Sequence, residues 1–232
     1  MTSDGKVVLV TGATSGIGLA LVERLRDCGY RPVLSGKDPA KVERLAAEAG
    51  VPGYPLEVSR EQNCAALATR IEAEVGPLWG LVNNAGIWLE GAFEDYSLEQ
   101  VRRVVEVNTL GTIFMTHAAL PHLLARGQGA VVNVVSTGAL YCRKSISVYS
   151  ASKWAVRGFT GCLEAECAPK GVRVMGFYPG KVATEMYNTA GIDRDLSVAM
   201  APAEAAAMIE LMLSSEGLVW SQVGGRSIRD YV

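Results

Sequence analysis

The sequence predicts an α/β protein built on a doubly wound parallel sheet, and three observations support this. Short, β-branched apolar runs alternate with longer segments of helical periodicity. The runs are apolar at nearly every position, which is typical of strands covered on both faces. The first run leads directly into a glycine-rich turn, T-G-A-T-S-G-I-G, over residues 11–18. Because parallel strands need right-handed crossovers, the pattern indicates a Rossmann-type fold with helices on both faces.

The elements follow in order along the chain. The apolar runs predict strands at Lys6–Thr11, Arg31–Ser35, Gly53–Val58, Gly80–Asn83, Ala130–Ser136, Val172–Tyr178 and, more weakly, Leu218–Val223. Helical periodicity predicts helices at Leu19–Cys28, Pro39–Ala49, Arg60–Val75, Leu98–Ala125, Tyr149–Ala168 and Pro202–Ser214. Ser97 followed by Gln100 is a capping-box pattern at the start of the Leu98 helix.

Length and composition favour one domain over residues 1–232, since 232 residues with 49% apolar content can bury a sizeable core. The two longest non-periodic stretches, residues 87–97 and 178–200, both follow strand ends. Ligands bind at that edge of such sheets, so we expect these stretches to form the rim of a substrate site.

Charge and cysteine content exclude several classes of function. A formal net charge of −2 gives no reason to expect nucleic acid or a membrane as partner, and no apolar run is long enough to cross a bilayer. Residues 1–6 lack the apolar stretch of a secretory signal. The five cysteines are odd in number and lack C-x-x-C spacing, and the two histidines belong to no metal-ligand cluster. We expect reduced thiols, no metal and a cytoplasmic protein.

The glycine turn predicts a site for a dinucleotide. Gly12, Gly16 and Gly18 lie between a strand and a helix, where backbone approaches a pyrophosphate and helix N–H groups bind its charge. After the second strand the sequence is Gly36-Lys37-Asp38, so Lys37 favours a 2′-phosphate and hence NADP(H). Asp38 argues for NAD(H) instead, unless it caps the helix that starts at Pro39.

Tyr149 and Lys153 are one helical turn apart and share a face, while Ser136 ends an apolar run. A free phenol titrates near 10, and a neighbouring ammonium lowers that pKa. We therefore expect Tyr149 to exchange a proton with a carbonyl or alcohol, Lys153 to lower its pKa, and Ser136 to bind the substrate oxygen.

With these residues, the chain resembles the single-domain branch of the short-chain dehydrogenase/reductase family over about residues 6–190. The glycine motif, Asn83-Asn84-Ala85-Gly86, Asn108, Ser136 with Tyr149 and Lys153, and the loop 179–184 all match its pattern. The resemblance implies Asn108, Ser136, Tyr149 and Lys153 as catalytic residues, with Asn108 holding a water that relays protons to Lys153. It implies cofactor contacts from Gly12, Thr14, Ser15, Gly16, Ile17, Gly18, Lys37, Glu57, Val58, Asn84, Ala85, Gly86, Tyr149, Lys153, Pro179, Gly180, Val182 and Thr184.

Three parts of the sequence depart from the family pattern. Glu57-Val58 replaces the usual Asp-Val beside the adenine, and Trp79 replaces an aspartate. We expect Trp79 to serve in packing. The tail, residues 221–232, lacks the usual Asp-Gly-Gly ending. Because that tail often builds subunit contacts in the family, a homodimer or homotetramer rests on the resemblance alone.

The expected activity is hydride transfer between a nicotinamide cofactor and a small apolar carbonyl compound or secondary alcohol. Trp88, Leu140, Tyr141, Met186 and Tyr187 are the candidate substrate residues, while Arg143 and Lys144 form either an anion contact or a solvated loop. A catalytically silent dinucleotide sensor and a purely structural protein are the alternatives. The sequence identifies neither the substrate nor the direction of the reaction.

Overall fold

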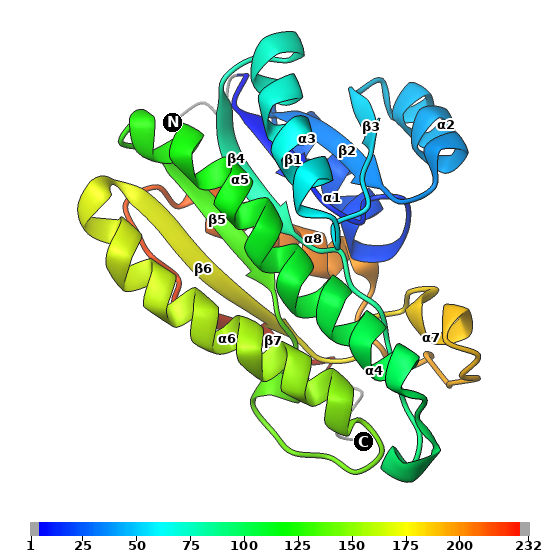
Figure 1. Cartoon of the computed structure of the whole chain (residues 1–232). Coiled ribbons are helices and arrows are strands. Elements are labelled where there is room, and N and C mark those ends of the chain that lie inside the picture. Colours follow the sequence, from blue (N-terminus) through cyan, green and yellow to red (C-terminus); the bar gives the residue numbers. More distant parts are fainter. Residues whose placement is uncertain (1–4, 228–232) are drawn as a thin grey trace.

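A seven-stranded sheet, parallel throughout, forms the centre of the molecule (Figure 1). The structure is a computed structural model and describes residues 5–227. The strand order is β3-β2-β1-β4-β5-β6-β7. The strands are β1 (Val7–Val10), β2 (Arg31–Gly36), β3 (Gly53–Pro55), β4 (Leu78–Asn83), β5 (Gly129–Val134), β6 (Val172–Pro179) and β7 (Gln222–Gly225). This order confirms the predicted doubly wound α/β fold, with the strand order reversing between β1 and β4.

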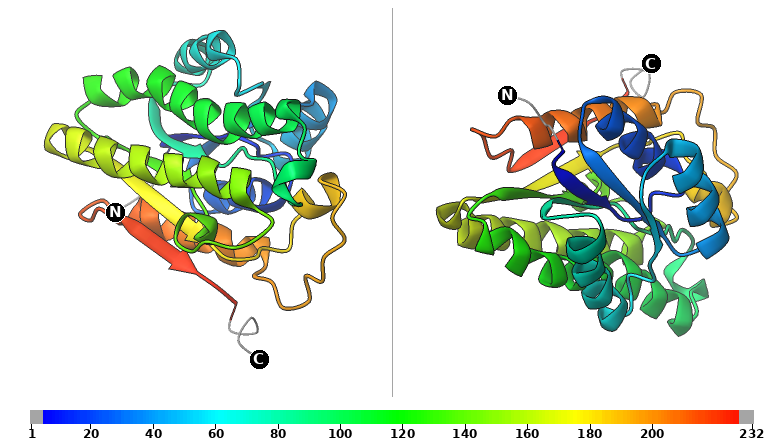
Figure 2. Two further views of the ribbon diagram at one scale, coloured as in Figure 1. Left: turned by 60° about the horizontal axis from the view of Figure 1, so that its bottom comes forward. Right: turned by 90° about the horizontal axis from the view of Figure 1, so that it is seen from above.

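Helices cover both faces of the sheet (Figure 2). On one face an apolar cluster joins the sheet to α1 (Gly16–Asp27), α2 (Pro39–Ala49) and α8 (Pro202–Ser214). On the other face a second cluster joins it to α3 (Glu61–Glu74), α5 (Gly111–Ala125) and α6 (Ser147–Cys167). The helix α4 (Leu98–Val105) extends α5 towards the carboxyl ends of the strands, where the short α7 (Met186–Thr189) also lies (Figure 1). The burial of the strands on both faces explains their uniformly apolar sequences.

The predicted helix 98–125 is helical throughout, but it is not α-helical at every residue. A π-helical turn, Glu106–Leu110, separates α4 from α5 and carries Asn108. The amide of Asn108 bonds to groups outside its own helix, and the Thr112 hydroxyl donates to the Asn108 carbonyl at 2.9 Å. Such turns accommodate one extra residue and often mark functional sites. The predicted capping box of Ser97 and Gln100 is confirmed.

Several predicted boundaries also move. The strand β3 ends at Pro55 rather than Val58, so Glu57 lies in the turn that follows. The weak final strand is Gln222–Gly225 rather than 218–223, because pairing with β6 begins at Gln222, and Leu218 and Val219 are 56% and 40% exposed. The helix α1 begins at Gly16, which places the end of the glycine motif in its first turn. The predicted tail beyond residue 227 and residues 1–4 lie outside the described residues.

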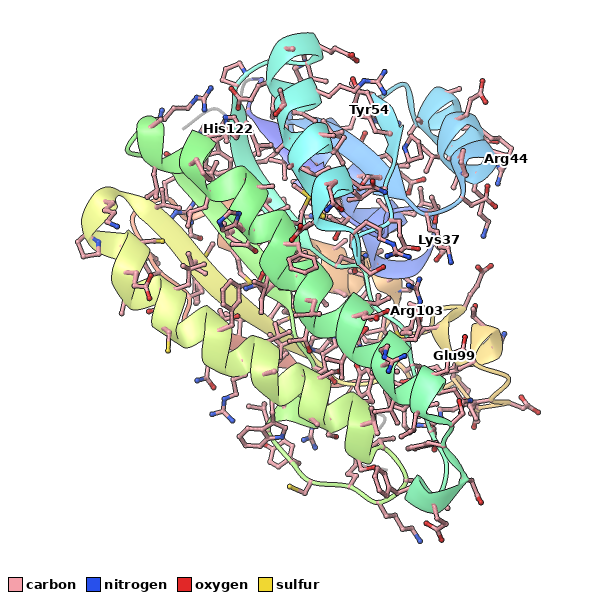
Figure 3. The ribbon with its side chains drawn as sticks, in the orientation of Figure 1. Lys37, Arg44, Tyr54, Glu99, Arg103 and His122 are labelled. Carbon is pink, nitrogen blue, oxygen red and sulfur yellow. The ribbon has the colours of Figure 1, made fainter. Side chains whose placement is uncertain are left out.

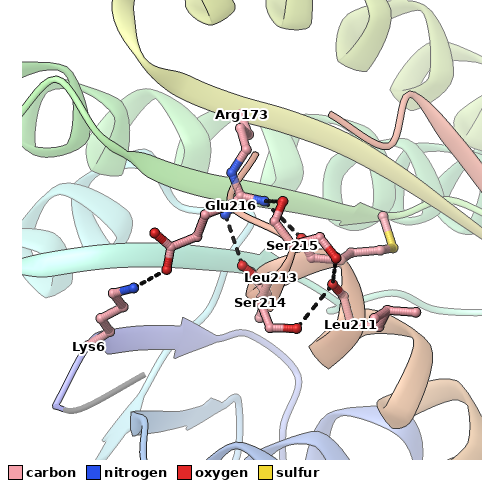
Figure 4. Close-up of polar contacts among 8 residues, drawn as sticks. Lys6, Arg173, Leu211, Leu213, Ser214, Ser215 and Glu216 are labelled. Atoms are coloured by element: carbon pink, nitrogen blue, oxygen red, sulfur yellow. Dashed lines mark hydrogen bonds and ion pairs between the residues drawn. The ribbon is translucent and has the colours of Figure 1, made fainter. Parts of the chain in front are cut away.

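Trp79 has the packing role expected of it. It lies in β4, is 7% exposed, and has the Lys6 ammonium 4.7 Å and the Arg173 guanidinium 5.8 Å from its ring. Arg173 also donates to the carbonyls of Met212 and Leu213, both at 2.9 Å, at the end of α8 (Figure 4). A cation at a helix C-terminus satisfies carbonyls that have no partner within the helix. Lys6 pairs with Glu216 in the same region (Figure 4).

A membrane-spanning segment would need a long apolar helix, and none occurs among residues 5–227.

Candidate active site

A cavity of about 560 Å³ opens at the carboxyl ends of the strands and runs from the glycine turn to Tyr149. Of the residues expected to contact a cofactor, most line it: Gly12, Thr14, Ser15, Gly16, Ile17, Lys37, Glu57, Val58, Asn84, Ala85, Gly86, Tyr149, Lys153, Pro179, Gly180, Val182 and Thr184. Gly18 does not, because it is enclosed between the Asn84 side chain and the backbone of the glycine turn. A Cβ at Gly18 would lie 2.6 Å from both the Asn84 amide nitrogen and the Gly12 carbonyl oxygen.

The glycine turn is held by the turn after β4. Gly12 has a φ of +62°, and a Cβ there would meet the Ala85 Cα at 2.7 Å. The Asn84 side-chain amide donates to the carbonyls of Thr11 and Gly12, at 3.0 and 2.9 Å. Two separate backbone segments therefore approach each other closely only because position 12 carries no side chain.

The start of α1 has the features that a pyrophosphate requires. The N-cap residue Ser15 makes no side-chain cap hydrogen bond, and Ser15, Gly16 and Ile17 line the cavity. The first N–H groups of a helix lack partners within the helix and attract negative charge. The residues present thus fit a dinucleotide lying across the end of the sheet.

At the end of the cavity remote from Tyr149, Lys37 follows β2 and Arg103 lies on α4 (Figure 3). Both approach Glu57: the Arg103 guanidinium donates to its carboxylate at 3.0 Å, and the Lys37 ammonium lies 3.6 Å away. Burial raises the pKa of Glu57, but hydrogen bonds from Ser59 and Arg103 outweigh it and lower the pKa below its usual value. Asp38 accepts from the backbone N–H groups of Ala40 and Lys41 at 3.0 and 3.2 Å, so it caps α2.

Ser136, Tyr149 and Lys153 meet at the other end. Ser136 follows β5 and accepts from the Gly138 N–H at 3.0 Å, and its hydroxyl acts to lower the pKa of the Tyr149 phenol. The Lys153 ammonium donates to the Val134 carbonyl at 2.9 Å and lies 6.0 Å from the centre of the Tyr149 ring. All three side chains line the cavity, and Tyr149 and Lys153 are each 5% exposed.

The pKa values differ from the expectation from sequence, which had Lys153 lowering the pKa of Tyr149. Burial raises the pKa of Tyr149 to about 12, although Ser136 and Arg143 act to lower it. Burial also lowers the pKa of Lys153 to about 8. The physical reason is that both groups are enclosed, and the ammonium is turned to the Val134 carbonyl. In this structure the phenol is protonated at neutral pH.

Asn108 lies behind Lys153 and does not line the cavity. Its side-chain oxygen Oδ1 accepts from the Ile87 N–H at 2.8 Å, and its side-chain nitrogen Nδ2 donates to the Ile87 carbonyl and the Ser152 hydroxyl at 3.0 and 3.1 Å. A Cβ at Gly86 would be 3.3 Å from the Asn108 amide oxygen and 3.7 Å from the Lys153 ammonium. Asn108 thus joins the segment after β4 to α6, and its proposed role in holding a relay water stays a prediction.

Comparison with known proteins identifies the family. The family model described as short chain dehydrogenase matches residues 6–195. The chain belongs to the short-chain dehydrogenase family. An uncharacterised oxidoreductase of Staphylococcus saprophyticus is 34% identical over 187 residues, which cover 78% of this chain and 80% of the relative.

Solved structures show the same architecture. A 3-ketoacyl-(acyl-carrier-protein) reductase from Brucella melitensis, complexed with NADH, is 28% identical with a TM-score of 0.91, covering 97% of this chain and 98% of its own. A variant of actinorhodin polyketide ketoreductase with NADPH is 30% identical with a TM-score of 0.88, covering 97% of both chains. This chain is a short-chain dehydrogenase/reductase enzyme.

Of the residues predicted to contact the substrate of this short-chain dehydrogenase, only some line the cavity. Trp88, Met186 and Tyr187 line the cavity, and the Trp88 ring lies against that of Tyr149 with centroids 4.3 Å apart. Leu140 and Tyr141 do not line it. Leu140 packs on the apolar cluster around Val135 and Tyr178, and Tyr141 is 55% exposed with the Arg226 guanidinium 4.6 Å from its ring. The tight turn after Ser136 directs both residues away from the cavity.

Some residues of the site were not found from sequence. Arg103 faces the cavity from α4, and Arg194 pairs with Glu90 beside Trp88. An acidic residue at a predicted strand end, such as Glu57, signals that a cation lies near, but the sequence does not show which one. Arg143, whose role the sequence left open, lines the cavity beside Tyr149. Among the described residues, no group of histidine, cysteine or acidic side chains is arranged to bind a metal ion.

Proposed function

We propose that this enzyme transfers a hydride between a nicotinamide dinucleotide, with NADP(H) favoured over NAD(H), and a small carbonyl compound or secondary alcohol. The observation that carries the proposal is one cavity that holds the glycine turn at one end and Ser136, Tyr149 and Lys153 at the other. The relatives in complex with NADH and with NADPH support a nicotinamide cofactor, since their folds superpose over nearly the whole chain.

The side chains act as follows in carbonyl reduction. The Tyr149 phenol, with a pKa of about 12, holds its proton at neutral pH and donates it to the substrate oxygen. The Ser136 hydroxyl donates to the same oxygen and orients the carbonyl. Lys153 places a cation beneath the site and binds the ribose hydroxyls, while Asn108 holds the relay water behind it. The bound nicotinamide supplies the hydride.

The preference for NADP(H) rests on the residues after β2. Gly36 places no carboxylate where a ribose 2′-hydroxyl would be bound, and the Asp38 carboxylate is already used to cap α2. Lys37 is 73% exposed at the cavity edge and offers a cation to a 2′-phosphate. Glu57 is engaged by Arg103 and Ser59, so it supports Arg103 at this edge rather than reaching freely for an adenine.

The substrate class rests on the other end of the cavity. Trp88, Met186 and Tyr187 come from the segments 87–97 and 178–200, and they present apolar surface beside the Tyr149 phenol. Such a wall suits a carbonyl flanked by hydrocarbon. The two segments form the rim of the substrate site in a single domain. The proposed binding partner is the small carbonyl compound or alcohol that enters there.

The proposal includes a homodimer or homotetramer that acts in the cytoplasm. Trp154 on α6 and Leu110 before α5 are 43% and 36% exposed, and large apolar side chains on the outer helices suit a subunit contact. No disulfide joins the cysteines of residues 5–227, which supports a reducing compartment. Light scattering on the purified protein measures the oligomeric state, and a monomer would contradict this part of the proposal.

The decisive experiment measures NADPH consumption with a panel of ketones and aldehydes. Oxidation of NADPH that depends on the carbonyl supports the proposal, and a sensor of the same fold would bind cofactor without turnover. Thermal unfolding with NADP(H) or NAD(H) separates the classes further. Cofactor at about 100 times its Kd stabilises the fold by about 2.7 kcal/mol. An unchanged Tm with both cofactors would contradict dinucleotide binding.

A further inference from the structure

An ion pair links the two rim segments beside the catalytic tyrosine. One Arg194 nitrogen lies 2.7 and 2.6 Å from the two carboxylate oxygens of Glu90, across 104 residues of sequence. The two side chains are only 21% and 23% exposed. A partly buried, charge-assisted contact of this kind is stronger than an ordinary surface pair.

The same pair holds the indole of Trp88. The Trp88 N–H donates to Glu90 at 2.8 Å, and the Arg194 guanidinium lies 5.7 Å from the Trp88 ring and 4.8 Å from the Tyr187 ring. Trp88 in turn stands edge-on to Tyr187 at 5.0 Å and lies over Tyr149 at 4.3 Å. One charge pair therefore contacts both aromatic rings of the wall beside the catalytic phenol.

The two segments are anchored differently. The first is tied to the loop before α6, because Gly91 donates to the Ser145 carbonyl at 2.9 Å and the Tyr96 hydroxyl donates to the same carbonyl at 3.0 Å. The second is pinned at its base, where Ala183 donates to the Met200 carbonyl at 2.9 Å and Met200 to the Lys181 carbonyl at 3.0 Å. Residues 183–199 thus form a flap whose two ends are held together, and Arg194 lies within it.

We propose that Glu90 and Arg194 form a latch that closes this flap and fixes Trp88 as a wall, so that the enzyme selects carbonyl compounds with one short substituent. The substrate selection rests on the function proposed above. The indole covers one side of the Tyr149 ring, so a bulky group on both sides of the carbonyl would meet it. Releasing the latch frees the indole and widens the site.

The test compares Glu90→Gln, Arg194→Gln and the double variant with the wild type on a methyl ketone and on a ketone with two bulky substituents. Each single variant raises KM for the methyl ketone about tenfold and changes kcat less than about threefold, since the latch positions Trp88 and donates no proton. The ratio of kcat/KM for the bulky over the small ketone rises about tenfold. The double variant resembles either single one, because both break the same contact.

Arg24→Gln is the matched control. It removes an ion pair of 3.1 Å to Glu210 that also joins distant segments but lies between α1 and α8. Its kinetics and substrate ratio stay at the wild-type values. Trp88→Ala raises the same substrate ratio without breaking the ion pair. Unchanged ratios in both latch variants would overturn the role of the latch in selection.

Hydrogen exchange separates the latch from the catalytic proposal. The amides of residues 183–199 exchange faster in both latch variants than in the wild type and in Arg24→Gln, whether or not the protein turns over any ketone. Equal exchange in all four proteins would overturn the latch. Faster exchange in an enzyme that oxidises no NADPH with any carbonyl would keep the latch and overturn the proposed function.

Discussion

The two ends of the cavity are built in different ways. At the cofactor end, backbone and short side chains make the surface, as at Gly12, where any Cβ would meet Ala85 at 2.7 Å. At the substrate end, the side chains of Trp88 and Tyr187 form the wall, held by a charge pair between two loops. The shape of the cofactor end thus depends on the folding of the sheet, whereas the side chains of the substrate end can change without altering the sheet. Substitutions should accordingly affect stability and cofactor binding at one end, and turnover and selectivity at the other.

The largest effect is expected for Tyr149→Phe. The phenol is the proposed proton donor, so its removal lowers kcat by at least about a thousandfold, which is about 4 kcal/mol of barrier. Fluorescence titration with NADPH should show a Kd within about threefold of wild type, because the ring itself remains. A kcat within tenfold of wild type would remove Tyr149 from acid–base catalysis.

The next effect concerns Lys153 and pH. Its pKa is about 8 in the folded protein, against 10.5 for the free side chain. The folded state therefore holds the neutral amine more readily, and this contribution to stability is present above pH 10.5 and lost as the pH falls through 8. Relative to Lys153→Met, the wild type loses about 3 kcal/mol of unfolding free energy between pH 10.5 and pH 7. Urea unfolding at both values measures the difference, and a constant difference between the two proteins would contradict it.

Gly12→Ala tests whether the cofactor end depends on the fold. The new Cβ meets Ala85, so the unfolding free energy falls by about 2 kcal/mol and cofactor binding weakens. Gly50→Ala is the control, because Gly50 has a φ of +67° and nothing within 4 Å of a Cβ. Gly50→Ala therefore loses only about 1 kcal/mol of stability to backbone strain, with no steric contact. If both variants lose the same stability, the close contact with Ala85 contributes nothing.

Lys37→Asp tests the cofactor preference. The substitution replaces a cation by an anion where the 2′-phosphate is proposed to bind, so the ratio of kcat/KM for NADPH over NADH falls by at least about tenfold. Lys170→Asp, on the turn after α6, serves as the charge control and leaves the ratio unchanged. An unchanged ratio in Lys37→Asp would place the phosphate contact elsewhere.

The smallest effect is expected at the substrate end, for Arg143→Gln. Arg143 lowers the pKa of Tyr149, so removing its charge raises that pKa. The pH profile of alcohol oxidation, which needs the deprotonated phenol, moves to higher pH. Lys144→Gln, its neighbour in the same exposed loop, leaves the profile in place. A shift to lower pH in Arg143→Gln would contradict the assignment.

Much of this protein follows from local sequence. The alternation of apolar runs and helical segments predicts the sheet, because strands covered on both faces are apolar throughout. Tyr149 and Lys153 share a helix face by spacing alone, and Asp38 before Pro39 indicates a cap that the structure confirms. These features depend on residues a few positions apart.

Other properties needed the tertiary structure. The pKa of Tyr149 is raised rather than lowered, because distant segments bury the phenol and the ammonium one turn away donates to the Val134 carbonyl. Leu140 and Tyr141 lie outside the cavity. Asn108 lies in a π-helical turn, and its side chain donates hydrogen bonds to Ile87 and Ser152. Glu90 and Arg194 meet across 104 residues. Periodicity and spacing report only local geometry, whereas desolvation and long-range charge pairing depend on which segments the fold brings together.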